Sequence, residues 1–298
     1  MPNYSKSFSI SNVGRFLDAI ANAGLGHPEV IPDGELHRFT TVEDKRNEKS
    51  GWYVLHLDPL AGSFGDWRSG IKEVWRPGAE KLTPTERKAF ADMKNKARRK
   101  RAAEEHQRHE KVAVAAQEMV ARAATAMWHP YLKSKRVLPF GIRQHNDQLV
   151  IPMMDTTGKI WSAQTICVGG TKRFLKGGRK KGVFHLIGGP VVDHFYICEG
   201  FATGATIHMH LDPHAPVFVA FDAGNLKPVA QALRKHYPGI RITVAADNDC
   251  WGAVNTGLEK GRQAATVIGA ELTYPTFENV DTSSRPTDFN DLYRLGGL

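Results

Sequence analysis

The sequence has too little cysteine for a zinc ribbon or a disulfide framework. Its three cysteines, Cys167, Cys198 and Cys250, lie far apart in a chain of 298 residues. Long apolar runs are also missing, because no stretch reaches about 18 uninterrupted apolar residues and residues 1–17 contain no signal-peptide hydrophobic region. We therefore expect a cytoplasmic protein that has no membrane partner.

Negative charge is in deficit as well. The chain has 40 Lys and Arg against 31 Asp and Glu, which gives a net charge of +9. This balance favours a polyanionic partner, although charge alone says nothing about the fold. No Walker A pattern is present, so no helicase motor is expected in these residues. With 41% hydrophobic residues, the chain can form two domains with proper cores.

The stretch 194–249 alternates apolar runs with amphipathic segments. Apolar runs at 195–198, 215–221 and 240–246 predict three buried strands, and a fourth is expected at 271–274. The segments between them have the length of helices, which predicts an α/β fold with a parallel sheet covered on both faces. Four carboxylates fall where these strands end: Glu199, Asp222, Asp247 and Asp249.

Such a group of carboxylates needs a cation, because like charges at one sheet edge repel one another. Mg²⁺ suits it, since this ion prefers oxygen ligands and shares its octahedron with substrate phosphates. Asp247 and Asp249 are two residues apart and can project to the same side as the strand ends. Glu199 can hold a second ion or accept the proton of an attacking hydroxyl, and both roles stay open.

Four sequence blocks resemble a known family: EGFATGATI at 199–207, FDAGNL at 221–226, AADND at 245–249 and DFNDLYRLGG at 288–297. A Glu after one strand and Asp-x-Asp after a later one resemble the Toprim signature. Among Toprim proteins, the blocks are most similar to the primases of mobile elements, of the plasmid TraC type and the satellite-phage type. One departure is clear, because DnaG-type primases begin with a zinc ribbon.

The resemblance implies a Toprim catalytic domain, Rossmann-like with a mostly parallel sheet, at 193–298. It also implies primer synthesis on a single-stranded DNA template from nucleoside triphosphates, in the replication of a plasmid, phage or other mobile element. Mg²⁺ or Mn²⁺ would be bound by Glu199, Asp247 and Asp249, with Asp288 beside them. A separate replicative helicase is the expected partner. Asp288 can equally be the N-cap of a short helix.

A basic, glycine-rich segment precedes the predicted Toprim domain, within a subdomain expected at 129–192. It resembles the basic subdomain that handles the triphosphate and the primer-template in DnaG-type primases. Glycines let a backbone approach phosphates, and the cations offset their charge. Asn225 is expected to cap the helix after 215–221, and Asp222 and Asn225 are further candidates for nucleotide contacts. The basic candidates are Lys172, Arg173, Lys176, Arg179 and Lys180.

Residues 1–80 predict a small α+β module, with a helix at 13–23 and strands at 36–39, 52–57 and 63–67. Its aromatic residues fit either a small core or a stacking surface for template bases, and the sequence leaves both open. These aromatic residues are Trp52, Phe64, Trp67 and Trp75.

Residues 81–128 predict a long charged helix that links the module to the rest of the chain. Thr83-Pro84-Thr85-Glu86 is typical of a helix start, and six cations occur between Lys94 and Arg101. These cations indicate either a solvated helix face or a contact with nucleic acid. A helix of this length is expected to break near Arg108.

Two other functions are compatible with the same residues. A Toprim-type metal-dependent nuclease would use the acids to activate water instead of a 3′-hydroxyl. A non-catalytic nucleic-acid-binding replication factor would need the basic residues but not the acids. Degradation of single strands without triphosphates would favour the nuclease, and failure to bind Mg²⁺ or Mn²⁺ would favour the binding factor.

Overall fold

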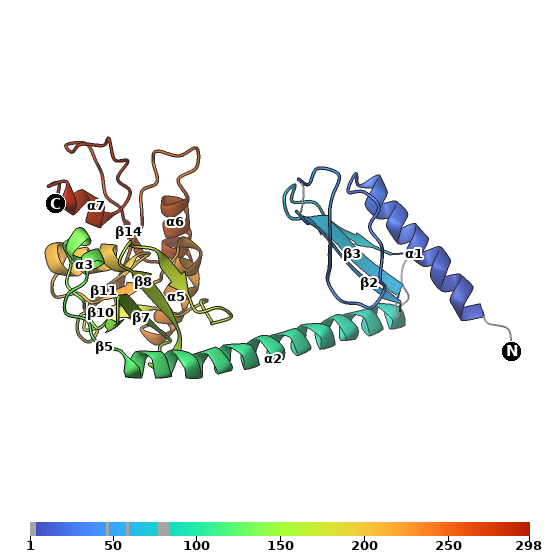
Figure 1. Ribbon diagram of the computed structural model, residues 1–298, viewed down its shortest axis with the longest axis horizontal. Helices are drawn as coiled ribbons and strands as arrows, with labels where there is room; N and C mark the ends of the chain where they lie inside the picture. The colour runs from blue at the N-terminus through green and yellow to red at the C-terminus, as the bar shows by residue number, and fades with distance from the viewer. Residues whose placement is uncertain (1–3, 46–47, 58–59, 77–83) are drawn as a thin grey trace. The chain divides into compact units, whose positions relative to one another are not determined.

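A computed structural model describes residues 4–45, 48–57, 60–76 and 84–298 of the chain (Figure 1). The chain divides into two compact units, Met1–Arg101 and Ala102–Leu298, and each is described by itself. The division expected from the sequence, into 1–80, 81–128, 129–192 and 193–298, stays a prediction. Within the described ranges, no helix is both long and apolar enough to cross a lipid bilayer.

The first unit packs one helix on an antiparallel sheet in the order β1-β2-β3-β4. Helix α1 covers one face of the sheet (Figure 1), and Phe16 and Ile20 from it are completely buried against Leu55 and Phe64. The helix begins earlier than the predicted residue 13, and strand β4 was not predicted. The bounds are α1 (Tyr4–Asn22), β1 (His37–Phe39), β2 (Gly51–Leu57), β3 (Leu60–Asp66) and β4 (Lys72–Trp75).

Helix α2 (Pro84–Arg122) runs through Arg108 without a break, so the expected interruption there is wrong. Its later turns bury Ala113, Ala116 and Val120, which packs with Val150. Packing of an apolar stripe stabilises a helix more than propensity does, and it holds these turns in place within the second unit. The predicted proline near the helix start is confirmed at Pro84, while residues 77–83 lie outside the described residues.

The second unit contains a small antiparallel sheet in the order β5-β6-β7-β8-β9. Strands β7 and β8 form a hairpin, in which they pair antiparallel from Gln148 opposite Cys167 to Met154 opposite Ile160. The last strand, β9, begins the basic segment. The bounds are β5 (Ala124–Thr125), α3 (Pro130–Lys135), β6 (Arg143–His145), β7 (Gln148–Met154), β8 (Ile160–Cys167) and β9 (Lys172–Phe174).

The other sheet of this unit has the order β10-β12-β11-β13-β14. All its neighbours pair in parallel except β10 with β12, so the predicted mostly parallel α/β sheet is confirmed. The edge strand β10 was not predicted. The strands are β10 (His185–Ile187), β11 (His194–Cys198), β12 (Val217–Val219), β13 (Arg241–Ala245) and β14 (Glu271–Thr273).

Helices cover this sheet on both faces. On one face, Leu226, Val229 and Leu233 of α5 pack with Ala264 of α6 over the strands. On the other face, α4 and the antiparallel sheet share a core that includes Phe201. The helices are α4 (Phe201–Thr206), the π-helical turn η1 (Ile207–Leu211), α5 (Ala223–His236), α6 (Thr256–Ile268) and α7 (Phe289–Arg294).

Candidate functional site

Parallel pairing brings the carboxyl ends of three strands to one edge. Cys198 lies opposite Val219 on one side and Ala245 on the other. The residues that follow these strands therefore share an edge, and the strand order places Glu199 between Asp222, at the start of α5, and Asp247. The Phe221 N–H donates to the Glu199 carbonyl at 2.7 Å, so the two strand ends are tied together.

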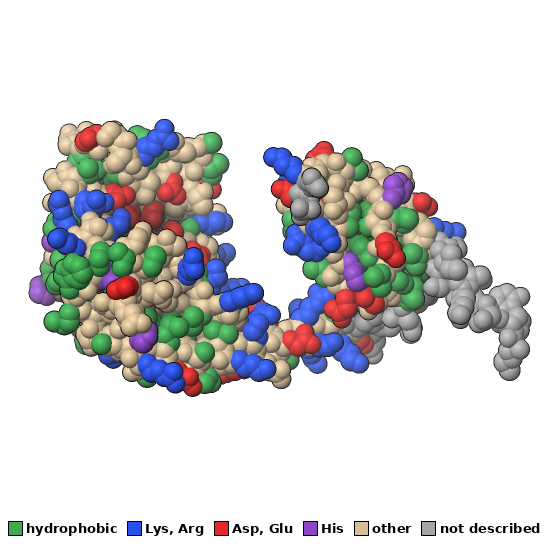
Figure 2. Space-filling model, viewed as in Figure 1, with side chains coloured by type: hydrophobic (Ala, Val, Ile, Leu, Met, Phe, Trp, Pro, Cys, Tyr) green, Lys and Arg blue, Asp and Glu red, His purple; other side chains and the backbone are tan. Residues whose placement is uncertain are grey.

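The acids at this edge raise one another's pKa. Burial raises the pKa of Glu199 to about 7, and the charges of Asp249 and Asp222 add to the effect. Burial raises the pKa of Asp247 to about 8, with Glu199, Asp288 and Asp249 acting in the same direction. Figure 2 shows acidic side chains gathered in a recess of this unit, with Lys and Arg side chains beside them.

Asp249 is held by the start of α6. Its Oδ2 accepts the Gly257 N–H at 2.8 Å, and its own N–H donates to Asn255 Oδ1 at 2.9 Å. A Cβ on Gly257 would lie 2.6 Å from the Asp247 carbonyl oxygen, so only glycine allows the helix to approach this closely. The local sequence thereby fixes the second acid of the Asp-x-Asp pair.

Asp288 combines the two roles that the sequence left open. It is the N-cap of α7, where its Oδ1 accepts the Asp291 N–H at 2.7 Å. It also lies at the acid edge, because the Thr203 hydroxyl donates to its Oδ2 at 3.1 Å and its charge raises the pKa of Asp247. Burial raises the pKa of Asp288 itself, followed by the charge of Asp291.

The donor set suits a divalent cation. Within the described ranges, no group of three His, Cys, Asp or Glu side chains is already close enough together to coordinate a metal ion. Yet Asp247 Oδ1 is buried with no hydrogen-bond partner among the described residues, and its pKa is raised by three other carboxylates. A cation would satisfy this oxygen and remove the repulsion, and oxygen-only ligands are those that Mg²⁺ and Mn²⁺ accept.

The predicted basic residues differ in which groups they lie near. The charge of Lys172, in β9, lowers the pKa of both Glu199 and Asp247, and Lys180 Nζ lies 4.0 Å from Asp222 Oδ2. Arg179 is engaged elsewhere, since its guanidinium lies over the Trp161 ring at 4.8 Å and 3.8 Å from Asp155.

Arg173 and Lys176 are exposed on the same segment. Their roles as nucleotide ligands stay predictions, as do those of the other candidates.

Asn225 does not cap α5. The cap is Asp222, whose Oδ1 accepts the Asn225 N–H at 2.9 Å. The Asn225 side chain is buried and bonds only main-chain groups: it accepts from Gly182 N–H and donates to the carbonyls of Val183 and Ala220. It therefore ties the basic segment to the end of β12.

Several residues beside the acids carry no local signal in the sequence. The Tyr131 hydroxyl is buried without a hydrogen-bond partner among the described residues, and burial together with the Asp288 charge raises its pKa. Lys135 Nζ lies 3.5 Å from Asp291 Oδ1, and the Lys135 carbonyl accepts from Asn290 Nδ2 at 2.7 Å. These contacts span about 155 residues, so periodicity could not reveal them.

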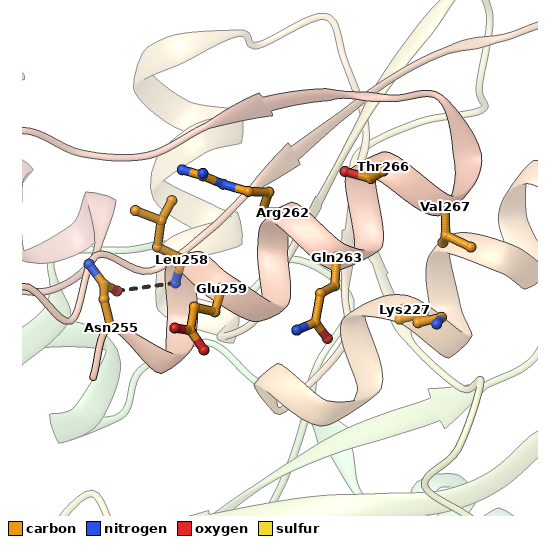
Figure 3. A pocket seen from close by; sticks show the side chains of 8 residues that line it. All are labelled: Lys227, Asn255, Leu258, Glu259, Arg262, Gln263, Thr266 and Val267. Atoms are coloured by element: carbon orange, nitrogen blue, oxygen red, sulfur yellow. Dashed lines mark hydrogen bonds between the residues drawn. The ribbon is translucent and has the colours of Figure 1, made fainter. Parts of the chain in front are cut away.

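One groove of this unit is not lined by the acids of the edge. It has a volume of about 670 Å³ between α5 and α6, and Figure 3 shows the side chains around it. The predicted catalytic and basic residues do not line it. Its lining residues are Lys227, Asn255, Leu258, Glu259, Arg262, Gln263, Thr266 and Val267.

Comparison with known proteins identifies part of the chain. Residues 194–298 match the family model of the Toprim domain. The chain is 35% identical over 301 residues to a DNA primase TraC of Escherichia coli, which covers 93% of this chain and 27% of that protein. A second Escherichia coli protein of the same name is 31% identical over 283 residues, with 88% and 19% covered. The chain thus spans about a quarter or less of the length of these curated relatives.

Two solved structures are distantly similar. The primase fragment of the bacteriophage T7 primase-helicase protein has a TM-score of 0.40 and 16% identity, and covers 56% of this chain and 65% of that one. The DnaG primase catalytic domain bound to ssDNA has a TM-score of 0.40 and 11% identity, with 64% and 76% covered. Likenesses this slight carry no inference. The family match and the strand-end acids agree with each other, and residues 194–298 are a Toprim domain within a chain that is similar to part of DNA primase TraC.

Proposed function

We propose that this chain carries a primase active site that synthesises short primers on single-stranded DNA by metal-dependent nucleotidyl transfer. The observation that carries the proposal is the group of mutually repelling, largely buried carboxylates at the carboxyl edge of the Toprim sheet. The similarity to DNA primase TraC supports the choice of reaction. Mg²⁺ or Mn²⁺, the template and the nucleoside triphosphates belong to the proposal.

Glu199, Asp247 and Asp249 would hold the metal, with Asp288 beside them. A divalent ion bound there supplies positive charge that favours ionisation of a 3′-hydroxyl and offsets the charge of the triphosphate. Asp247 gives up its proton when it binds a cation, because only the carboxylate is a good ligand. Asp288 keeps its bond to Thr203, which orients it toward the other acids.

The basic residues would bind the triphosphate. The charge of Lys172 acts on Glu199 and Asp247, and Arg173 and Lys176 extend the positive surface along the same segment. In the reaction, the 3′-oxygen attacks the α-phosphorus, a new phosphodiester bond forms, and the bond to pyrophosphate breaks. Glu199 would act either as a ligand of the metal or, where the two aspartates alone hold it, as the base that accepts the hydroxyl proton.

A primer-synthesis assay with the protein, single-stranded DNA, labelled nucleoside triphosphates and Mg²⁺ or Mn²⁺ tests this proposal. The wild type and the control variant Asp281→Asn, which changes an exposed acid away from the site, should make short products. Glu199→Gln and the double variant Asp247→Asn/Asp249→Asn should make none while remaining folded. Equal synthesis by Glu199→Gln would remove Glu199 from the mechanism.

The same assay separates the other two functions. A template that shortens in the presence of metal but without triphosphates would identify a nuclease. Binding of template with neither synthesis nor cleavage would point to a non-catalytic factor, or to the need for the separate helicase that we propose as partner.

A further inference from the structure

A tryptophan in the first unit is exposed and yet held firmly in place. Trp67 follows β3 and exposes 53% of its surface. Its N–H donates to the Ser50 carbonyl at 3.1 Å. On either side, the buried Asp66 carboxylate accepts the N–H groups of Arg68 and Ser69, each at 3.0 Å. Because these hydrogen bonds already fix the turn, a ligand that covers the ring costs little further conformational entropy in the protein.

The ring belongs to a cluster of aromatic and cationic groups. The Trp52 ring lies 5.9 Å from it, tilted by 30°, and the Arg38 guanidinium lies 4.9 Å from its centroid. Arg38 is fixed in turn, because its Nη2 donates to the Lys49 carbonyl. A guanidinium stacked on an indole presents a flat, positively charged edge beside an apolar face.

These residues form one row across the sheet. Arg38 pairs with Trp52, Trp52 with Gly65, and Gly65 with Lys72, so their side chains share a face. A Cβ on Gly65 would lie 2.9 Å from a carbon of the Trp52 ring, so the ring lies flat over this glycine. The result is a smooth aromatic surface with a cation at each end. We call Arg38, Trp52, Trp67 and Lys72 the tryptophan face.

The tryptophan face is distinct from the core of its unit. Phe64 and Trp75 point to the opposite face, where their rings lie 5.8 and 5.2 Å from the Phe16 ring of α1. The two interpretations that the sequence left open thus apply to different rings. Phe64 and Trp75 pack the core, while Trp52 and Trp67 do not.

The charge around the face favours a polyanion. Arg38 and Lys72 are exposed, whereas the nearby Asp44 and Glu48 carboxylates are both paired with Arg68. An apolar protein partner would need neither cation. A single nucleic-acid strand can contact both kinds of group. Its bases have free π-faces that can stack on the rings, and its regularly spaced phosphates can bind the cations. A duplex would hide those π-faces in its own stack.

We infer that the tryptophan face binds single-stranded DNA, with a base stacked on Trp67 and phosphates on Arg38 and Lys72. The choice of DNA as the strand rests on the proposed function, in which this face would hold template. The face is separate from the acid edge, and stacking on it needs neither metal nor nucleotide.

Fluorescence anisotropy of a labelled single-stranded oligonucleotide with the full chain, in EDTA and without triphosphates, tests the inference. Trp67→Ala should raise Kd about tenfold, whereas Trp67→Phe should restore most of the affinity. Trp128→Ala is the matched control, since it removes another exposed tryptophan (65%), in the second unit, and should leave Kd unchanged. Arg38→Gln should weaken binding and lower the slope of log Kd against log salt by about 0.7.

The outcomes are distinct. Equal Kd values for the wild type and Trp67→Ala would overturn the inference, whether or not the protein makes primers. A Trp67-dependent Kd without any primer synthesis would support the inference while the proposed function fails. Tighter, Trp67-dependent binding of RNA than of DNA of the same sequence would overturn the choice of strand. If circular dichroism showed that Trp67→Ala is misfolded, Arg38→Gln would still decide the outcome, because a Kd and a salt slope unchanged from the wild type in that variant would overturn the inference.

Discussion

Asp66, at the end of β3 in the first unit, and Asp247, just after β13 in the second, are both largely withdrawn from water, yet their surroundings shift the carboxyl pKa in opposite directions. Burial works to raise the pKa of Asp66, but hydrogen bonds from Ser50, Arg68 and Ser69 outweigh it and hold the pKa well below its usual range. Asp247 Oδ1 has no such donor among the described residues, and burial and neighbouring carboxylates raise the pKa of Asp247 to about 8. A satisfied carboxylate stabilises a turn, whereas an unsatisfied one is available to a ligand.

The first and largest expected difference is in catalysis. Asp247→Asn should lower the rate of nucleotide addition by at least about a hundredfold, because a neutral amide binds a divalent ion poorly. Asp66→Asn should change the rate per folded molecule less than about twofold. Steady-state primer synthesis, corrected for the folded fraction, measures both. A hundredfold loss in Asp66→Asn would remove the distinction between the two acids.

The second difference is in stability, where the order reverses. Asp66→Ala should lower the free energy of unfolding by about 2 kcal/mol, because the N–H groups of Arg68 and Ser69 lose their charged acceptor. Urea unfolding at pH 7 measures the loss. Asp281→Ala removes an exposed carboxylate that caps only Ser283 and serves as the control. A change in Asp66→Ala no larger than in this control would show that the turn does not depend on Asp66.

The third prediction concerns pH. Folding raises the pKa of Asp247 from about 4 to about 8, so between these values the folded state keeps a proton that the unfolded state releases. The stability of the metal-free protein should therefore fall as pH rises through this window. The free energy of unfolding of Asp247→Asn should decrease less over this window. This variant should be more stable than the wild type at pH 8 by on the order of 1–2 kcal/mol, with a smaller gain at pH 5.

Unfolding in EDTA at pH 5 and pH 8 measures this gain, and the metal provides its counterpart. Adding Mg²⁺ at pH 8 should stabilise the wild type more than Asp247→Asn, because only the wild type has an ionised carboxylate at this position that can bind the ion. A gain that is the same at both pH values would mean that Asp247 does not titrate in this range.

The smallest expected effect involves the cation that moderates the acids. Lys172 lowers the pKa of both Glu199 and Asp247, so Lys172→Gln should raise both. The acid limb of the pH–rate profile should then move to higher pH by about half a unit. Lys260→Gln, which changes an exposed cation on α6, should leave the limb in place. If the acid limb of the pH–rate profile stays in place in both variants, the charge of Lys172 does not act on the pKa of these acids during catalysis.

Much of the acid edge could be predicted from the sequence because its signals are local. A buried run followed by an acid marks a strand end, and parallel strands place their ends at one edge. The edge strand β10 escaped prediction because it is only three residues long, and the early start of α1 was missed because that stretch is rich in serine, which has only a modest helix propensity. The roles of Tyr131 and Asn290 depend on contacts far along the chain, which no local pattern encodes.

The hydrogen bonds of Asn225 bear on which side chains of the basic segment can be substituted. Its amide holds the basic segment through main-chain atoms alone, at Gly182, Val183 and Ala220. The side chains of Lys176, Lys180 and Lys181 can therefore be exchanged without loosening the anchor. Evolution, or an engineer, can alter the charge pattern of this loop while the scaffold beneath it stays the same.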